Sequence, residues 1–124
     1  MAKVLVIDDE EGIRDLLDTL LSRKGYEVVL SSNGQRGLEL FHRERPDVVV
    51  LDLKMPGMDG LTVLQQIRTR DPKMPVIVLT GAGTAETELK VRALGATDYV
   101  EKEFSLHRLG DSLKRLLVPS NPLT

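Results

Sequence analysis

Acidic residues directly follow two short apolar runs of the sequence. A threonine ends a later apolar run, and a lysine lies just after another. Asp8 and Asp9 follow the first run, Asp52 follows another, and Thr80 and Lys102 hold similar places further on. Three carboxylates brought together repel one another, so at least one is driven toward its neutral form unless a cation is present. Mg²⁺ suits such a site because it is a hard cation that prefers oxygen ligands. These residue types predict an acidic magnesium site with a hydroxyl and an ammonium group beside it.

The composition argues against several other kinds of site. The chain has no cysteine, which excludes disulfides, thiolate metal ligands and thiol nucleophiles. The two histidines, His42 and His107, fall on predicted helices, where we expect surface positions without chemistry. A formal net charge of -2 argues against direct nucleic-acid binding by this domain, because phosphate neutralisation needs a basic face. No apolar run is long enough to span a bilayer, and we expect neither a signal peptide nor membrane association.

The elements that must position these residues alternate between strand and helix five times. Continuous apolar runs predict buried strands at Lys3–Ile7, Asp47–Leu51 and Pro75–Leu79, and weaker patterns predict strands at Tyr26–Leu30 and Thr97–Val100. Apolar residues at helical spacing predict helices over Glu10–Lys24, Asn33–Glu44, Leu61–Arg70, Thr84–Leu94 and Ser105–Val118. Asn33 is a predicted N-cap, and Gly25 and Gly95 stand where left-handed C-terminal caps belong.

This alternation predicts an α/β fold, a doubly wound, five-stranded parallel sheet with helices on both faces. The three most apolar strands should be central and the two weaker ones should be edges. The flavodoxin-like order 2-1-3-4-5 satisfies both conditions. Ligands bind such sheets outside the carboxyl ends of the strands, where the chain reverses direction. We therefore expect Asp8, Asp52, Thr80 and Lys102 to converge on one crevice.

Taken in order, these motifs resemble the receiver domains of two-component response regulators, of the chemotaxis-regulator type. The resemblance rests on Asp8-Asp9, Asp52, the Gly- and Pro-rich loop Lys54–Gly60, Thr80, the run Ala93–Tyr99 and Lys102. It covers Lys3 to about Val118. Residues 1–118 are therefore expected to form one receiver domain, and residues 119–124 a tail or the start of a linker.

The resemblance implies which residues accept the phosphoryl group and hold the metal. Asp52 is the expected nucleophile that becomes an acyl phosphate, a covalent role open to a carboxylate. Asp9, Asp52 and the backbone carbonyl of Lys54 are the expected direct Mg²⁺ ligands. Asp8 is expected to act mainly through a metal-bound water. Such a domain is not an enzyme toward other molecules, since it catalyses only its own magnesium-dependent phosphorylation and dephosphorylation.

The resemblance also implies how a signal leaves the site. Lys102 is expected to pair with one phosphoryl oxygen, and Thr80 to hydrogen-bond another. When Thr80 is drawn inward, Tyr99 is expected to change rotamer and follow. The signal then reaches the face formed by the fourth helix, the fifth strand and the fifth helix, as a shift between two existing states.

The implied partners follow from the same family. They are a sensor histidine kinase, a phosphotransfer protein or a small phosphodonor on the input side, and an output domain or protein on the other. A homodimer formed on phosphorylation is a further expectation. The implied setting is the bacterial cytoplasm.

Each site residue has a plainer explanation when it is taken alone. Asp8 and Asp9 could cap a helix, and Asp52 could belong to a turn. Lys102 could be a solvated lysine, and a partly buried tyrosine such as Tyr99 needs no switch role. The coincidence of the acids, Thr80 and the lysine at convergent strand ends favours the functional interpretation.

Two positions leave alternatives open. The side chain of Lys54 either attracts the phosphoryl group or extends into solvent, and the sequence favours neither. Glu103 stands where the family usually has proline. Because a non-proline cis peptide is costly, the sequence leaves open whether the Lys102–Glu103 bond is cis.

Three other functions fit parts of the pattern. A degenerate receiver would keep the fold without phosphorylation, but loss of an acid, the threonine or the lysine would favour it, and none is missing. A flavodoxin-like cofactor binder needs a donor-rich phosphate loop. The run Gly81-Ala82-Gly83 begins a dinucleotide fingerprint but no third glycine follows at Glu86. A haloacid-type phosphatase shares an aspartate nucleophile, but this chain is short for its extra elements.

Overall fold

The computed structural model describes residues 2–81, 83–102 and 105–117. Five parallel strands form one sheet: β1 (Lys3–Ile7), β2 (Glu27–Ser31), β3 (Val48–Leu51), β4 (Val76–Thr80) and β5 (Asp98–Glu101). Their order is β2-β1-β3-β4-β5, which confirms the predicted topology. The helices between them are α1 (Glu11–Arg23), α2 (Gly34–Glu44), α3 (Gly60–Arg70), α4 (Ala85–Ala93) and α5 (Ser105–Leu117).

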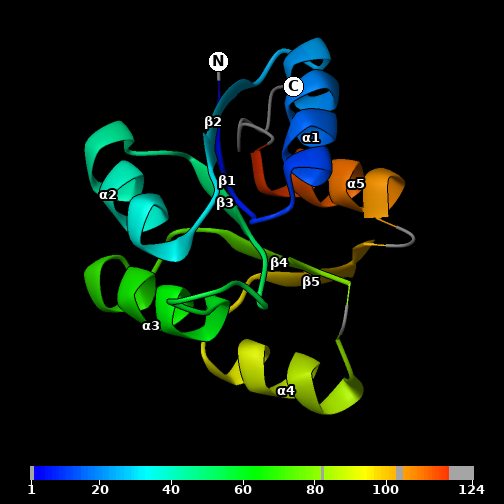
Figure 1. Cartoon of the computed structure of the whole chain (residues 1–124). Coiled ribbons are helices and arrows are strands. Elements are labelled where there is room, and N and C mark those ends of the chain that lie inside the picture. Colours follow the sequence, from blue (N-terminus) through cyan, green and yellow to red (C-terminus); the bar gives the residue numbers. More distant parts are fainter. Residues whose placement is uncertain (1, 82, 103–104, 118–124) are drawn as a thin grey trace, which may run out of the picture.

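The helices cover both faces of the sheet, with α1 and α5 on one face and α2, α3 and α4 on the other (Figure 1). Strand β1 shows how its alternating side chains build the two layers. Val4 and Val6 pack with apolar residues of α1 and α5, whereas Leu5 and Ile7 pack with those of α2 and α3. All four are completely buried, because a central parallel strand is covered on both sides.

The helix ends largely follow the predicted caps. The Asn33 side chain accepts a hydrogen bond from the backbone N–H of Arg36 at 2.8 Å. Gly25 and Gly95 have φ of +93° and +99°, a conformation that glycine adopts without steric cost. The end of α2 differs from the usual glycine pattern, since Arg45 is the left-handed residue that follows it, with φ of +48°.

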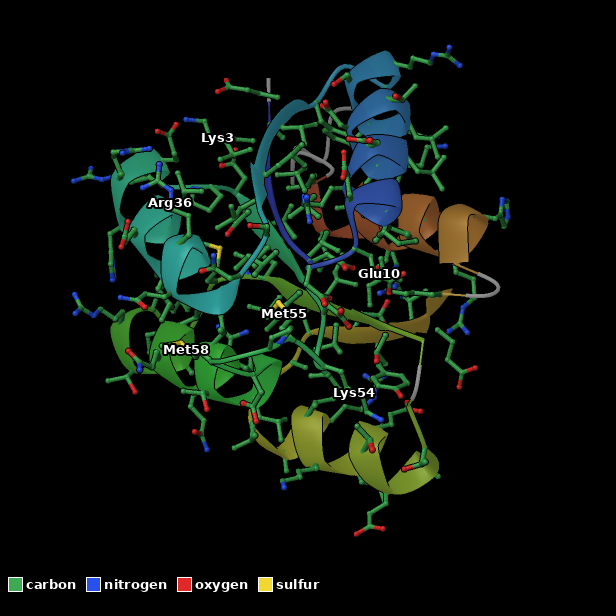
Figure 2. The ribbon with its side chains drawn as sticks, viewed as in Figure 1. Lys3, Glu10, Arg36, Lys54, Met55 and Met58 are labelled. Atoms are coloured by element: carbon green, nitrogen blue, oxygen red, sulfur yellow. The ribbon has the colours of Figure 1, made fainter. Side chains whose placement is uncertain are left out.

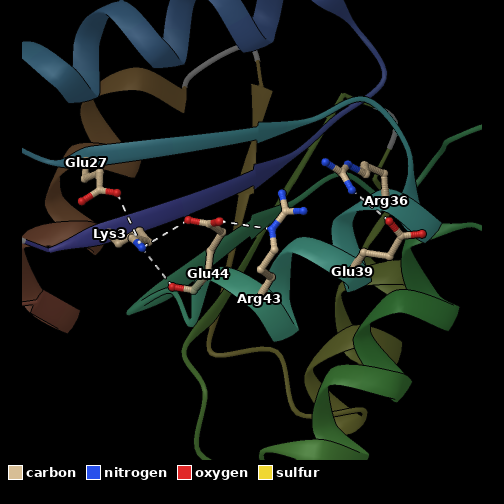
Figure 3. Close-up of polar contacts among 6 residues, drawn as sticks. All are labelled: Lys3, Glu27, Arg36, Glu39, Arg43 and Glu44. Atoms are coloured by element: carbon tan, nitrogen blue, oxygen red, sulfur yellow. Dashed lines mark hydrogen bonds and ion pairs between the residues drawn. The ribbon is translucent and has the colours of Figure 1, made fainter.

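At the amino end of the sheet, away from the predicted site, a network of ion pairs links neighbouring elements (Figure 3). The ammonium of Lys3 lies 3.5 Å from a carboxylate oxygen of Glu27 and 3.4 Å from one of Glu44. It also donates to the backbone carbonyl of Glu44 at 3.0 Å. One side chain of β1 therefore ties together β2 and the last turn of α2. The pKa of Glu44 is lowered by these contacts, chiefly by its hydrogen bond with Lys3.

Two predictions fall outside the described residues. These are the geometry of the Lys102–Glu103 peptide and the tail at residues 119–124. Within the described part of the chain, no helix is long and apolar enough to cross a membrane.

Candidate functional site

The carboxyl ends of four strands bring the predicted site residues to one edge of the sheet. Asp8 directly follows β1 and Asp52 directly follows β3. Thr80 is the last residue of β4, and Lys102 directly follows β5. Asp8, Asp52 and Thr80 are 2%, 4% and 1% exposed. The predicted convergence is therefore present, because parallel strands end at the same edge.

Backbone contacts fix the two buried aspartates. The N–H of Asp52 donates to the carbonyl of Ile7 at 2.9 Å, and the N–H of Asp8 donates to the carbonyl of Ser31 at 3.0 Å. Gly60, the first residue of α3, lies against the chain at Asp52. A Cβ at Gly60 would lie 2.2 Å from the Asp52 carbonyl oxygen, so a larger residue there would displace the loop that carries Asp52.

The ammonium of Lys102 lies among three carboxylates. Its Nζ is 3.1 Å from Oδ2 of Asp8 and 3.4 Å from Oδ2 of Asp52. Its shortest contact is a hydrogen bond of 2.5 Å to Oε1 of Glu10. These residues are separated by up to 94 positions in the sequence. A single cationic side chain thus neutralises part of the charge that gathers at the strand ends.

Burial dominates the electrostatics of the two aspartates. It raises the pKa of Asp52 to about 6, helped by the charge of Asp8 and opposed by Lys102, while a side-chain hydrogen bond with Asp9 adds to the rise. Burial also raises the pKa of Asp8, although its hydrogen bond from the backbone N–H of Glu10 and the charge of Lys102 oppose this. Lys102 therefore compensates the ionised carboxylates only in part, as expected of a site that binds a further cation.

Lys102 responds in the opposite sense. Burial by itself lowers the pKa of its ammonium, but the hydrogen bond to Glu10 and the charges of Asp8 and Asp52 outweigh burial and raise the pKa. Lys102 is therefore charged at any physiological pH.

The chemistry of the donor set fits a hard divalent cation. Asp8, Glu10 and Asp52 each offer a carboxylate oxygen, and these atoms lie within 4.8 Å of one another. Glu10 was not among the predicted site residues. The sequence feature that could have identified Glu10 is its position two residues after Asp8, just beyond the same central strand.

The other predicted ligands lie at the rim of this cluster. Asp9 is exposed and reaches the Asp52 carboxyl through a side-chain hydrogen bond. Lys54 is exposed and lies between the end of β3 and α4, while Glu10 lies at the foot of α1 (Figure 2). Lys54 also lines a cavity of about 580 Å³ together with Met55, Leu61, Thr80 and Thr87.

The predicted switch residues meet at the turn between β4 and α4. Tyr99 is 4% exposed, and among the described residues its hydroxyl is the one buried side-chain polar atom without a hydrogen-bond partner. A Cβ at Gly83 would lie 1.3 Å from the Tyr99 hydroxyl oxygen and 3.0 Å from Cγ2 of Thr80. The buried position of Tyr99 therefore depends on glycine at residue 83.

Comparison with known proteins identifies the family. The profile of the response regulator receiver domain matches residues 4–114. The chain belongs to this family. The receiver domain is 36% identical over 115 residues to sporulation initiation phosphotransferase F of Bacillus subtilis, covering 93% of both chains. It is 46% identical over 119 residues to the probable transcriptional regulator ycf27 of Guillardia theta, covering 96% of this chain and 46% of that protein.

Solved structures agree with this assignment. A receiver domain protein from Clostridium thermocellum superposes with a TM-score of 0.90 at 33% identity, and all of both chains is covered. The response regulator TrrA of Thermotoga maritima, in complex with Mg²⁺-BeF, superposes with a TM-score of 0.86 at 36% identity, covering 94% of this chain and all of that one.

Many of the curated relatives extend beyond a receiver domain. The present chain spans 45–50% of the length of the ycf27 regulators that it matches and 25% of the regulatory protein AtoC of Escherichia coli. It spans nearly all of sporulation initiation phosphotransferase F. The shared region of these proteins is the receiver domain, with and without further sequence.

Proposed function

We propose that this receiver domain is a signalling switch driven by phosphorylation of Asp52. The observation that carries the proposal is the Asp52 carboxylate, which is buried at the carboxyl edge of the sheet, 3.4 Å from the Lys102 ammonium. In the proposed step an oxygen of Asp52 attacks the phosphorus of the donor. The bond from phosphorus to the leaving group breaks, and the leaving group departs with its electron pair.

The acidic cluster is the proposed magnesium site. Asp8, Asp9 and Asp52 would hold the ion with the backbone carbonyl of Lys54, and Asp8 would act mainly through water. When bound, Mg²⁺ supplies neutralisation of the charge on the transferring phosphoryl oxygens. The crystallised TrrA of Thermotoga maritima, which is a complex with Mg²⁺-BeF, supports this assignment.

Lys102 and Thr80 complete the proposed phosphoryl site. The ammonium of Lys102 would pair with one phosphoryl oxygen, and the Thr80 hydroxyl would hydrogen-bond another. Together they would neutralise charge on the phosphoryl group and fix its position. Movement of Thr80 toward the phosphoryl group would change the packing of Tyr99. In the proposed switch, this change is passed to the face formed by α4, β5 and α5, and it shifts an existing equilibrium.

Input and output are proposed from the relatives. A sensor histidine kinase, a phosphotransfer protein or a small phosphodonor would supply the phosphoryl group in the cytoplasm. The match to transcriptional regulators favours an output domain or protein controlled through the α4-β5-α5 face, with a homodimer formed on phosphorylation. Direct nucleic-acid binding would then belong to an output partner and not to this acidic domain.

The test is the intact mass of the protein after incubation with acetyl phosphate. We expect a phosphoryl adduct that requires Mg²⁺, forms on the wild type and is absent from Asp52→Ala. The matched control is Asp15→Ala, which removes an exposed acid of α1 and should leave the adduct unchanged. A folded wild type that forms no adduct with any phosphodonor would instead support an interaction module that works without phosphorylation.

A further inference from the structure

We propose that Glu10 is a positioning residue that holds the Lys102 ammonium at the mouth of the site and thereby raises the affinity of the site for Mg²⁺. The inference rests on the proposed function and concerns a residue that the phosphoryl-transfer step itself does not require. It follows from where the Lys102 ammonium lies relative to its three acidic partners.

The three partners differ in depth and in distance. The side chains of Asp8 and Asp52 are 2% and 4% exposed, whereas that of Glu10 is 59% exposed. The hydrogen bond from Lys102 to Glu10 is 2.5 Å long, while its contacts with Asp8 and Asp52 are 3.1 and 3.4 Å. The ammonium is therefore held most closely by the outermost acid.

The backbone at Glu10 is fixed, so its side chain approaches Lys102 from a defined place. The N–H of Glu10 donates to Oδ1 of Asp8 at 2.9 Å. The carbonyl of Glu10 accepts the N–H of Arg14 at 3.0 Å in the first turn of α1. Glu10 is the N-cap residue of that helix, yet its side chain makes no capping hydrogen bond. That side chain is directed instead to Lys102.

The ammonium and a divalent cation compete for the same oxygens. Asp8, Glu10 and Asp52 form the group whose carboxylate oxygens lie within 4.8 Å of one another, and the Lys102 ammonium contacts all three. Because two cations repel at such distances, Lys102 must withdraw from the buried pair when Mg²⁺ binds. Glu10 offers it a partner further out, from which it can still reach a phosphoryl group on Asp52.

Loss of the Glu10 charge should therefore act through Lys102. In Glu10→Gln the ammonium loses its closest acid, and the two buried carboxylates become the strongest attraction among its described partners. Lys102 would move inward and oppose Mg²⁺ more strongly. A Lys102→Met variant removes the competing cation, so it should bind Mg²⁺ more tightly than the wild type does.

A double-mutant cycle on Mg²⁺ affinity tests the proposal. Titration calorimetry with MgCl₂ and no phosphodonor would be made on the wild type, Glu10→Gln, Lys102→Met and the double variant. We expect Glu10→Gln to weaken Mg²⁺ binding by roughly fivefold or more in the wild-type background and by less than about twofold in the Lys102→Met background. Glu11→Gln, which removes the same charge from the next residue, is the matched control and should bind Mg²⁺ as the wild type does.

Three outcomes would overturn the inference. Equal weakening in both backgrounds would make Glu10 a metal ligand or a general source of negative charge, and unchanged or tighter binding by Glu10→Gln would exclude a positioning role. Mg²⁺ binding that is absent from the folded wild type would end both this inference and the proposed function. Conversely, a magnesium-dependent adduct on Asp52 together with no coupling between Glu10 and Lys102 would leave the proposed function intact and remove only this inference.

Discussion

Asp52 lies buried at the edge of the sheet, and its pKa of about 6 follows from that burial, from the charge of Asp8 and from the hydrogen bond with Asp9. A carboxyl whose pKa is raised on folding binds a proton more tightly in the folded state than in the unfolded chain. Stability therefore falls as the pH rises from about 4 toward and through 6, and ionised Asp52 opposes folding at neutral pH. The proposed phosphoacceptor thus lowers the stability of the metal-free protein.

A neutral side chain at residue 52 should remove this cost. We expect Asp52→Asn to increase the free energy of unfolding by roughly 1–3 kcal/mol at about pH 7.5 without Mg²⁺. The gain should shrink as the pH falls through 6 and be small near pH 4, because folded Asp52 is then protonated and the pH is close to the ordinary pKa of 3.8 that the group has in the unfolded chain. Urea unfolding across this pH range measures the effect, with exposed Asp15→Asn as control. A gain that does not depend on pH would contradict the assignment of the cost to ionisation.

The sequence predicted site residues to different extents for physical reasons. Asp8, Asp52 and Lys102 were predictable because each directly follows a strand, and parallel strands end at one edge. The contact between Glu10 and Lys102 was not predictable, because it joins two side chains that lie 92 positions apart in the sequence. It was equally hidden that the Tyr99 hydroxyl has no hydrogen-bond partner among the described residues, because burial of a tyrosine does not reveal whether a donor or acceptor is within reach.

Among the elements, strand order was the most predictable feature. The runs in β1, β3 and β4 are apolar throughout, which a strand needs only when helices cover both of its faces. Helix ends were predictable where a side chain or a glycine performs the capping, as at Asn33 and Gly95. The end of α2 was less predictable, because Arg45, a residue with a Cβ, adopts the left-handed conformation there that glycine usually supplies.

The most specific steric prediction concerns the turn between β4 and α4. A Cβ at Gly83 would overlap the Tyr99 hydroxyl, so Gly83→Ala should drive Tyr99 from its buried position and cost about 1–3 kcal/mol of stability. The chain has no tryptophan and only two tyrosines. Acrylamide quenching of tyrosine fluorescence in a Tyr26→Phe background therefore reports on Tyr99 alone, and Gly83→Ala should increase it.

The control for this experiment is Gly12→Ala. A Cβ at Gly12 would meet nothing within 4 Å, and alanine is the better helix former, so quenching should stay at the wild-type level. Equal quenching in Gly83→Ala and Gly12→Ala would mean that the turn moves to admit the methyl group. Residue 83 would then not control the position of Tyr99.

Over the whole molecule, the two ends of the sheet differ in how their charges are arranged. The acids of the site gather at the carboxyl edge, where helices that alternate with parallel strands begin. Basic residues occupy the last turns of all five helices, where the helix dipole favours cations. Within the part of the chain that the structure describes, the fold therefore offers a divalent cation a concentrated acidic site at the carboxyl edge.

We therefore expect the stability of the whole domain to depend on magnesium. Mg²⁺ that binds the folded chain and not the unfolded one should raise the free energy of unfolding by about 1.4 kcal/mol at tenfold excess over its dissociation constant. The increase should be smaller at about pH 5 than at about pH 7.5, because the raised pKa values of Asp52 and Asp8 let protons compete with the metal. Thermal unfolding with MgCl₂, compared with NaCl of equal ionic strength, measures it. Asp52→Asn should show most of the increase lost, whereas an equal increase in that variant would place the bound ion away from the acidic cluster.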